Sequence, residues 1–369
     1  MLCSSEQQSH TDCEHNHDDD LNLEFDEEEN IEPCLLMDEV NQCSISNWYY
    51  LYDGKTNPQI TPKRITILTK IIKLEDDFIE YLKQDGVVLP ASVDTKKVVP
   101  NFESDSDEER EKYANSDDED DENKVPEFTA LQLQIADALD EFEEVFPKMN
   151  WSAPKDANWM LSESSLLRCK SIEDVFLVLK SSSFVTHDIQ KAYNNCMNYK
   201  PESEIKRVLA LRKWYDVNPS MEFRCFVKDR TLIGISQRDI SNFYKFLLVD
   251  LENVTEKLVT FWEKYIKHSF PLSQYTVDLY ISRTGAVFIV DFNVFGPPTS
   301  PLLFNSFKSG HLSSDSKELV VKVVENNEGV MRPSFKMYSG VPDDFFSVDN
   351  AQNLQEFIEK QQKLQRNEK

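Results

Sequence analysis

The chain has 369 residues and a formal net charge of −26, and most of that charge lies in two segments. Residues 1–47 hold 14 acids and no Lys or Arg, and residues 103–127 hold 13 acids against three basic residues, so the remainder is nearly neutral. That distribution excludes a basic stripe for binding nucleic acid, and the sequence has neither a membrane-length apolar run nor a CxxC pair.

Composition divides the chain into five segments. Residues 1–44 are predicted to be a disordered acidic tail, and residues 101–127 a disordered acidic insertion, because such sequences bury too little apolar surface to fold. Residues 45–100 are expected to form an N-terminal α/β part and the partner-binding region. Residues 128–349 form the predicted core, and residues 350–369 a polar C-terminal helix or tail. Unpaired cysteines and the lack of a signal peptide favour a cytoplasmic protein, which we expect to be a monomer.

The N-terminal part begins with a dense aromatic cluster, SNWYYLY at residues 46–52. Large aromatic side chains are more often core than partner surface, so Trp48 and Tyr49 are interpreted as core. Residues 64–74 (RITILTKIIKL) are rich in β-branched side chains and predict a strand. The segment DDFIEYLKQDG that follows predicts an amphipathic helix, which Gly86 ends.

The core begins with FTALQLQIADALDEFEEVF, where apolar residues at helical spacing predict a helix within residues 128–146. Lys155 follows an Ala-Pro pair and precedes an expected Trp-Met strand, a position from which its side chain could reach into a cleft. A second helix is predicted to start at Ser171. Three β-rich runs and a further helix follow, at residues 207–217, 221–228, 231–239 and 254–268. Residues 320–333 are expected to form a closing hairpin.

Residues 276–293 (TVDLYISRTGAVFIVDFN) predict a β-hairpin. A turn centred on Thr284-Gly285 would place Asp278 opposite Asp291, with Asn293 on the same face. Opposed acids about 5 Å apart destabilise a sheet. Two carboxylates and an amide oxygen suit magnesium, whose shell is completed by water and nucleotide phosphates. The alternative is a solvated strand end with two unrelated acids, but the apolar runs around both acids favour a metal site.

Glycine is absent from the chain between Gly86 and Gly234. This absence excludes a Walker P-loop, a Rossmann fingerprint and a kinase glycine-rich loop in that region. A phosphate site there must use side-chain cations, and the candidates are Lys155, Lys213, Arg224 and Arg238. Each could be an ordinary surface residue, but the two arginines lie on or end β-runs that must pack against the hairpin.

A basic strand pair, a preceding lysine and a later acid-acid-Asn hairpin form the layout of an ATP-grasp nucleotide site. Three segments in this order, FPKMNWSAPKDANWM, LRKWYDVNPSMEFRCFVKDRTLIGISQRD and DLYISRTGAVFIVDFNVFG, closely resemble the eukaryotic cell-division-cycle protein 123 family. SNWYYLY, EDDFIEYLKQDGVVLP and SGVPDDFF extend the resemblance from about residue 45 to 348. It implies an α+β, ATP-grasp fold with mostly antiparallel sheets that binds Mg-ATP. It also implies an assembly factor that engages the γ subunit of eukaryotic translation initiation factor 2, so that the α and β subunits can join.

The resemblance also implies roles for individual residues. Asp278, Asp291 and Asn293 would bind the magnesium ion. Lys155 would face the phosphates, two arginines would complete that side, and residues 212–214 would form the hinge against adenine, largely through backbone groups. The full set of predicted nucleotide-binding residues is Lys155, Ala157, Arg212, Lys213, Trp214, Glu222, Arg224, Arg238, Asp278, Asp291 and Asn293.

Two other functions stay open at the level of sequence. One is an ATP-grasp carboxylate–amine ligase acting on a protein or peptide, because the same cations and metal would serve it. The other is a scaffold with a vestigial site, which the intact acid-acid-Asn set argues against. We expect Asp291→Ala to abolish Mg-ATP binding and to leave the fold intact, because the change removes one of two repelling acids.

Overall fold

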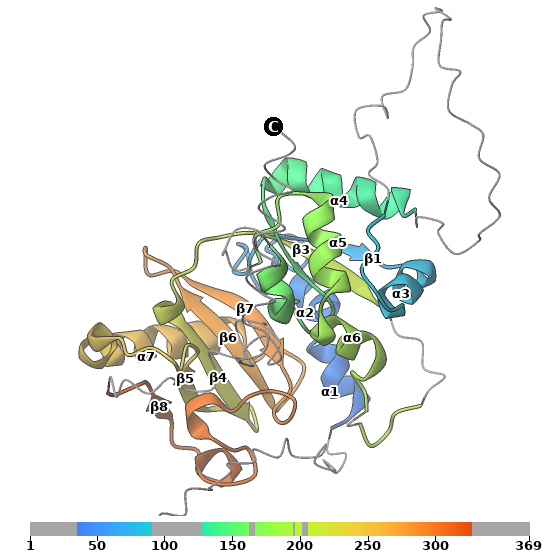
Figure 1. The fold of residues 1–369 in the computed structure, drawn as a ribbon. Helices are drawn as coiled ribbons and strands as arrows, with labels where there is room; N and C mark the ends of the chain where they lie inside the picture. Colours follow the sequence, from blue (N-terminus) through green and yellow to red (C-terminus); the bar gives the residue numbers. More distant parts are fainter. Residues whose placement is uncertain (1–34, 91–126, 162–166, 195, 201–205, 327–369) are drawn as a thin grey trace, which may run out of the picture.

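The computed structural model describes residues 35–90, 127–161, 167–194, 196–200 and 206–326 (Figure 1). The predicted acidic insertion lies outside these ranges except for its last residue. The predicted C-terminal helix or tail at residues 350–369 also lies outside them. No helix within the described residues is long and apolar enough to cross a membrane.

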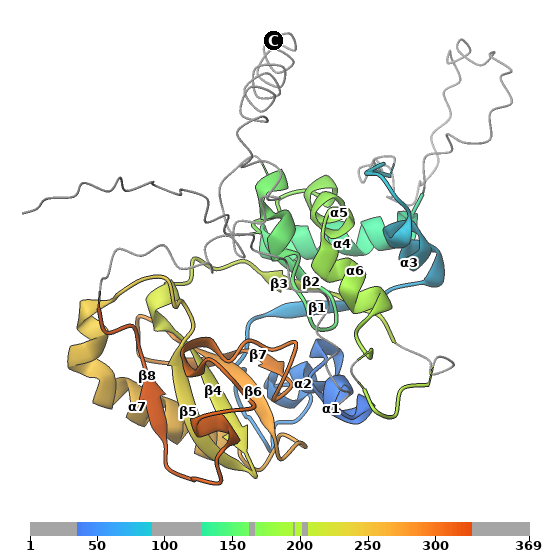
Figure 2. The same ribbon diagram turned by 60° about the horizontal axis from the view of Figure 1, so that its bottom comes forward.

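Two sheets form the framework, each in its own lobe (Figures 1 and 2). The small sheet has the order β1-β3-β2, built from β1 (Thr69–Lys73), β3 (Val208–Lys213) and β2 (Val145–Lys148). The large sheet has the order β7-β6-β4-β5-β8, built from β4 (Glu222–Lys228), β5 (Thr231–Gln237), β6 (Tyr275–Ile281), β7 (Val287–Asn293) and β8 (Val320–Lys322). Among these described strands, every neighbouring pair except β5–β8 is antiparallel. The predicted α+β fold with mostly antiparallel sheets is confirmed.

Helices cover one face of the small sheet. They are α3 (Asp76–Lys83), α4 (Thr129–Phe142), α5 (Ile172–Lys180) and α6 (Ser183–Gln190), and their buried residues form one hydrophobic cluster with Leu209 and Leu211 of β3. Helix α5 starts where the sequence predicts, because Ser171 and Asp174 form a reciprocal capping box. The small sheet therefore has one face packed against helices and one face turned toward the large sheet.

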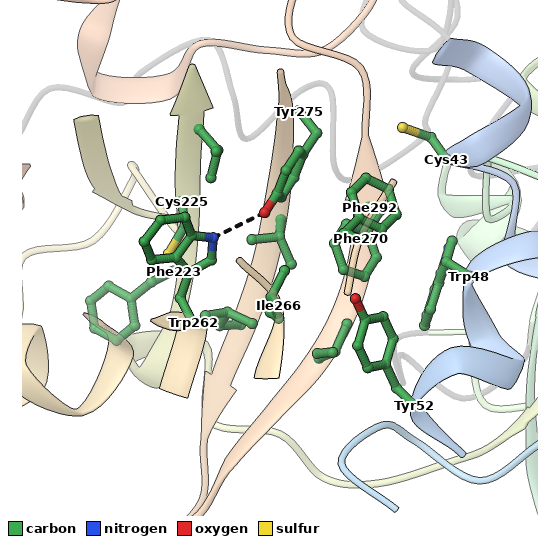
Figure 3. Close-up of a cluster of buried hydrophobic side chains, with 14 of the residues drawn as sticks. Cys43, Trp48, Tyr52, Phe223, Cys225, Trp262, Ile266, Phe270, Tyr275 and Phe292 are labelled. Carbon is green, nitrogen blue, oxygen red and sulfur yellow. Dashed lines mark hydrogen bonds between the residues drawn. The ribbon is translucent and has the colours of Figure 1, made fainter. Parts of the chain in front are cut away.

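The large sheet packs one face against α7 (Lys245–Tyr265) and the N-terminal helices α1 (Met37–Gln42) and α2 (Ile45–Tyr52). Figure 3 shows the centre of this core, where Phe270 and Phe292 stack with ring centroids 4.1 Å apart. Trp48 and Tyr52 pack against the same Phe292 ring. The interpretation of Trp48 and Tyr49 as core residues is confirmed, since they are 0% and 6% exposed.

The last ten residues of the predicted acidic tail are part of the fold. Residues 35–44, predicted as the end of the acidic tail, include helix α1 and a bridge between Leu35 and Cys196. Val40 is buried, while two acids occupy the first turn of α1, where the helix dipole favours negative charge. Acidic composition therefore concealed a short helix that belongs to the fold.

Three other elements differ from their predictions. Lys155 opens a 3₁₀ helix, η2 (Lys155–Met160), so the expected Trp-Met strand is wrong. The carboxylate of Asp156 accepts hydrogen bonds at the start of α6, from the Ser182 hydroxyl (2.6 Å) and from the backbone N–H of Ser183 (2.7 Å), and these bonds hold η2 in place. Helix α7 begins at Lys245 rather than near residue 254. Strand β8 pairs in parallel with β5, so the part of the closing hairpin that is described does not pair with itself.

The two sheets are joined by hydrogen bonds just before β1. The backbone N–H of Ile289 in β7 donates to the carbonyl of Ile65 (2.8 Å), and the Thr66 hydroxyl donates to the carbonyl of Ile289 (3.1 Å). Thr66 is buried. Residues 65–66 thus extend the edge of the large sheet before the chain enters the small one. This junction brings the inner face of the small sheet to the hairpin of β6 and β7.

Candidate functional site

Strands β6 and β7 place Asp278 directly opposite Asp291, as the sequence predicts. The route to this pairing differs from the expected one. The turn centres on Thr284 alone rather than between Thr284 and Gly285, which shifts the pairing near the turn by one residue. A β-bulge then leaves Val290 without a cross-strand partner and brings the two acids back into register.

Arg224 lies opposite Asp278 on β4 and forms a buried bidentate pair with it. Nε of Arg224 donates to Oδ1 at 2.7 Å and Nη2 donates to Oδ2 at 2.8 Å, while Nη1 donates to the carbonyl of Ser300 at 2.9 Å. Burial alone would raise the pKa of Asp278, but the charge and hydrogen bonds of Arg224 outweigh it and lower that pKa to about 2. The guanidinium of Arg224 is therefore committed to holding Asp278.

Asp291 has a cation partner of its own, Lys148 at the end of β2. The Lys148 ammonium donates to Oδ2 of Asp291 at 2.8 Å and also to the carbonyl of Trp151. The side chain of Lys148 is 3% exposed and that of Asp291 is 17% exposed. Oδ1 of Asp291 is buried and has no hydrogen-bond partner among the described residues. Because Asp278 and Asp291 each have a cation, the mutual repulsion expected from sequence is already relieved.

Arg212, on the inner face of β3, is a second group with unused hydrogen-bonding capacity. Its side chain is buried, and in the part of the chain that the structure describes its Nε and Nη2 atoms have no hydrogen-bond partner. Burial lowers the pKa of Arg212, while the nearby Asp291, Tyr49 and Glu222 oppose that shift. A buried guanidinium with two unsatisfied donors is costly unless an anion joins it.

Lys155 and Arg238 complete the positive side of the site. Nε of Arg238 lies 3.4 Å from Oδ2 of Asp278, and its backbone N–H donates to the carbonyl of Glu222 at 3.0 Å. Burial of the Lys155 ammonium lowers the pKa of Lys155 to about 8, and the charge of Arg238 adds to this effect. Glu222, Asp278 and Asp291 act on Lys155 in the opposite direction. These residues therefore share one electrostatic environment.

Two predicted hinge residues point elsewhere. Alternation along β3 places Lys213 on the face of Leu211, which packs against the helices, and not on the face of Arg212. The Trp214 ring lies under the guanidinium of Arg168, with Cζ 4.7 Å from the ring centroid. The backbone N–H groups of Lys213 and Trp214 donate to other carbonyls, so only the carbonyl groups of these two residues remain for an adenine.

The last two predicted site residues are Asn293 and Ala157. Asn293 lies two positions beyond Asp291 on the same face of β7 and pairs with Thr276 across the ladder. Ala157 is fully buried in η2, two residues after Lys155. Asn293 can therefore add an amide oxygen beside the acids, while Ala157 can offer only backbone groups.

Lys148 is the site residue that the sequence prediction missed. It lies in the quoted FPKMNW motif but was not counted among the cations, because one lysine after a short apolar run resembles a surface residue. The available signal was that Lys148 ends a short strand and that nearby residues in the chain, Val145, Pro147 and Met149, are apolar. All three neighbours are buried in the structure.

The site holds more positively charged side chains than negatively charged ones. Five cations (Lys148, Lys155, Arg212, Arg224 and Arg238) interact with three acids (Glu222, Asp278 and Asp291). Within the described residues, no three His, Cys, Asp or Glu side chains are grouped to hold a metal. The oxygens of Asp291, Asp278 and Asn293 are nevertheless hard ligands that suit magnesium, provided that an anion supplies further ligands and offsets the excess positive charge.

Comparison with known proteins identifies the family. The D123 family model matches residues 61–349. A translation initiation factor eIF2 assembly protein of Xenopus tropicalis is 32% identical over 349 residues, covering 90% of this chain and 98% of that protein. The cell division cycle protein 123 of Yarrowia lipolytica is 40% identical over 272 residues, covering 73% of this chain and 67% of that protein.

A solved structure gives the same result. Cdc123 of Schizosaccharomyces pombe superposes with a TM-score of 0.62 at 27% identity, covering 79% of this chain and 99% of that chain. The predicted resemblance is therefore confirmed in both sequence and fold. On these matches, the chain belongs to the D123 family, as Cdc123 and the eIF2 assembly proteins do.

Proposed function

We propose that this protein binds Mg-ATP at the charged site between its two sheets and acts as an assembly factor for eIF2. In this proposal it is a cytoplasmic monomer that engages the γ subunit and promotes its union with the α and β subunits. The names of its relatives support the assembly role. The arrangement of cation-bearing strands around an acid-acid-Asn hairpin supports the nucleotide role.

The observation that carries the nucleotide proposal is a pair of opposite unsatisfied groups. Within the described ranges, Arg212 has two buried donor atoms without partners, and Asp291 has one buried acceptor without a partner. The two side chains interact electrostatically. Buried polar groups are nearly always paired, so these unpaired atoms of Arg212 and Asp291 support the presence of a ligand that would pair with them. A phosphate would satisfy the guanidinium, and a divalent cation bound to that phosphate would satisfy the carboxylate.

The other cations, the hairpin residues and residues 212–214 have roles that their positions support. Lys155 and Arg238 would contact phosphate oxygens, and Arg224 would fix Asp278 rather than touch phosphate itself. The magnesium ion, held by the hairpin residues, would shield the negative charge of the phosphates. The carbonyl groups of residues 212–214 would face the adenine. The excess of cations over acids favours a triphosphate with its magnesium ion and disfavours the ion alone.

Arg212→Met is expected to weaken Mg-ATP binding on the order of a hundredfold, because it removes two charge-assisted hydrogen bonds. Thermal stability should be equal or higher, since the variant also removes a buried cation with unpaired donors. Calorimetric titration with ATP, with and without magnesium, measures the first effect, and differential scanning calorimetry measures the second. Lys73→Met, at an exposed position on the neighbouring strand β1, is the control and should bind as the wild type does.

Unchanged affinity in Arg212→Met would refute the placement of phosphate at this site. Steady release of ADP in the absence of a partner would refute an assembly factor without rapid chemistry. That result would favour the alternative function, a carboxylate–amine ligase acting on a protein or peptide.

The proposed partner is tested by mixing the purified full-length chain with each separate eIF2 subunit. We expect capture of γ and not of α or β, measured by pull-down and by size-exclusion chromatography. Capture of α or β in place of γ would contradict the proposal. Deleting residues 45–100 to map the partner surface is unsuitable, because the deletion removes Trp48 and Tyr52 from the core around Phe292. Single substitutions of exposed residues such as Tyr50 and Val88 are the better probes.

A further inference from the structure

The Lys148 ammonium occupies one carboxylate oxygen of Asp291, a residue that we propose as a metal ligand. It donates to Oδ2 of Asp291 at 2.8 Å, and its second acceptor is the carbonyl of Trp151. That carbonyl belongs to a loop that is held firmly. The carboxylate of Asp188 accepts hydrogen bonds from the backbone N–H of Trp151 (3.1 Å) and from the backbone N–H and hydroxyl of Ser152 (both 2.7 Å). The carbonyl of Trp151 is therefore a fixed acceptor for an ammonium group beside Asp291.

We propose that Lys148 is a built-in counter-ion that excludes divalent cations from Asp291 until a nucleotide is present. Nucleotide phosphates would draw the ammonium away and leave Asp291 to the metal ion that arrives with them. The inference rests on the proposed function in one respect, namely that Asp291 is a metal ligand. It adds a residue and a reason why metal and nucleotide would bind together.

The argument begins with the difference between the two ion pairs of the site. Arg224 binds both oxygens of Asp278 and a backbone carbonyl, so moving it would break three hydrogen bonds. Lys148 binds a single oxygen of Asp291 and one backbone carbonyl, so moving it would break two hydrogen bonds. A lysine is a compact charge on a flexible stem, whereas an arginine fork is held rigidly by a bidentate partner. The Lys148–Asp291 pair is therefore the one suited to open.

The second step concerns electrostatics. An ammonium at hydrogen-bond distance repels any divalent ion that approaches the same carboxylate, and the repulsion is strong because the site is largely shielded from water. No described residue hydrogen-bonds to Oδ1 of Asp291, so the carboxylate has the capacity to bind a metal ion. Metal-free Asp291 is nevertheless neutralised, which lets the protein fold without the ion. Removing the ammonium should free both oxygens of this carboxylate for a metal.

The test uses Mn²⁺ as the probe, titrated into full-length protein without nucleotide and followed by electron paramagnetic resonance. Lys148→Met is expected to bind Mn²⁺ at least about tenfold more tightly than the wild type, since a full charge at this distance is worth that much or more. The double variant Lys148→Met/Asp291→Asn should lose the gain, which would locate the ion at Asp291. Lys73→Met, which removes the same charge from an exposed position on β1 outside the site, should behave as the wild type does.

A stability measurement covers the case in which Lys148→Met folds poorly. Added Mn²⁺ should then raise its Tm and leave the Tm of the wild type and of the double variant unchanged. The proposal is overturned by a folded Lys148→Met that gains no Mn²⁺ affinity, or by a wild type that binds Mn²⁺ alone equally well. Failure of the wild type to bind ATP would instead refute the proposed function, and the metal titration would still decide the role of Lys148.

Discussion

Asp291→Ala is expected to lower the free energy of unfolding by about 3–5 kcal/mol, the usual cost of removing one partner from a buried ion pair. The substitution would leave the Lys148 ammonium buried without its carboxylate partner. It would also remove the acid that interacts with the buried Arg212. Chemical denaturation of the metal-free protein at neutral pH measures the effect.

The control for this variant is Asp315→Ala, which removes an exposed acid 3.9 Å from Lys228 and should leave stability unchanged. The double variant Lys148→Met/Asp291→Leu should recover most of the loss, because it replaces the pair with apolar side chains of similar size. An Asp291→Ala protein as stable as the wild type would show that the Lys148–Asp291 pair contributes nothing.

Arg224→Met should be equally destabilising at neutral pH, by about 3–5 kcal/mol, because it strands the buried carboxylate of Asp278. The cost should depend on pH. In the wild type Arg224, with smaller contributions from the charges of Arg238 and Lys155, outweighs burial and lowers the pKa of Asp278 from 3.8 to about 2. A depressed folded-state pKa gives stability that is complete above the unfolded value and is lost as the pH falls through the folded value.

The difference in unfolding free energy between wild type and Arg224→Met should therefore be largest at neutral pH. It should shrink by at least about 2 kcal/mol as the pH falls toward 2, because the wild type loses the contribution of ionised Asp278 and the variant relieves its unpaired carboxylate by protonation. Denaturant unfolding of both proteins from pH 6 to pH 2 gives the comparison, and other acids that titrate in both proteins cancel in the difference. A difference that stays constant or widens toward low pH would contradict the assignment of Arg224 as the partner that keeps Asp278 ionised.

The acid pair itself could be predicted from sequence, and its partners could not. Strand alternation and a short turn are local properties, so Asp278 and Asp291 could be placed opposite each other from the hairpin alone. Their cations come from elsewhere in the chain, since Arg224 lies 54 positions from Asp278 and Lys148 lies 143 positions from Asp291. The expectation that Asp291→Ala would leave the fold intact assumed unrelieved repulsion. That assumption is wrong because each acid is paired.

In the fold as well, elements set by local sequence could be predicted, and elements that depend on distant contacts could not. Helix α5 was predicted at its first residue because Ser171 and Asp174 carry a local capping signal. The strands of the large sheet were predicted because their periodicity is strong. Helix α1 was missed because it is held by distant residues such as Tyr193, whose hydroxyl donates to Oδ1 of Asn41, while its own composition is acidic. The face on which Lys213 lies could not be assigned until Leu211, two positions before it on β3, was known to pack against helices α3 to α6.

The junction between Thr66 and Ile289 has a consequence for biosynthesis. The two residues are 223 positions apart, and a ribosome adding about 5–20 residues per second needs on the order of 10–40 s to make that stretch. Throughout that interval the emerging Trp48 and Tyr52 lack Phe292, the ring on which both pack. The N-terminal helices must therefore stay in solution with an apolar face uncovered until the last strand of the hairpin leaves the ribosome. The nascent chain of this protein should be a stronger substrate for cellular chaperones than its compact native state suggests.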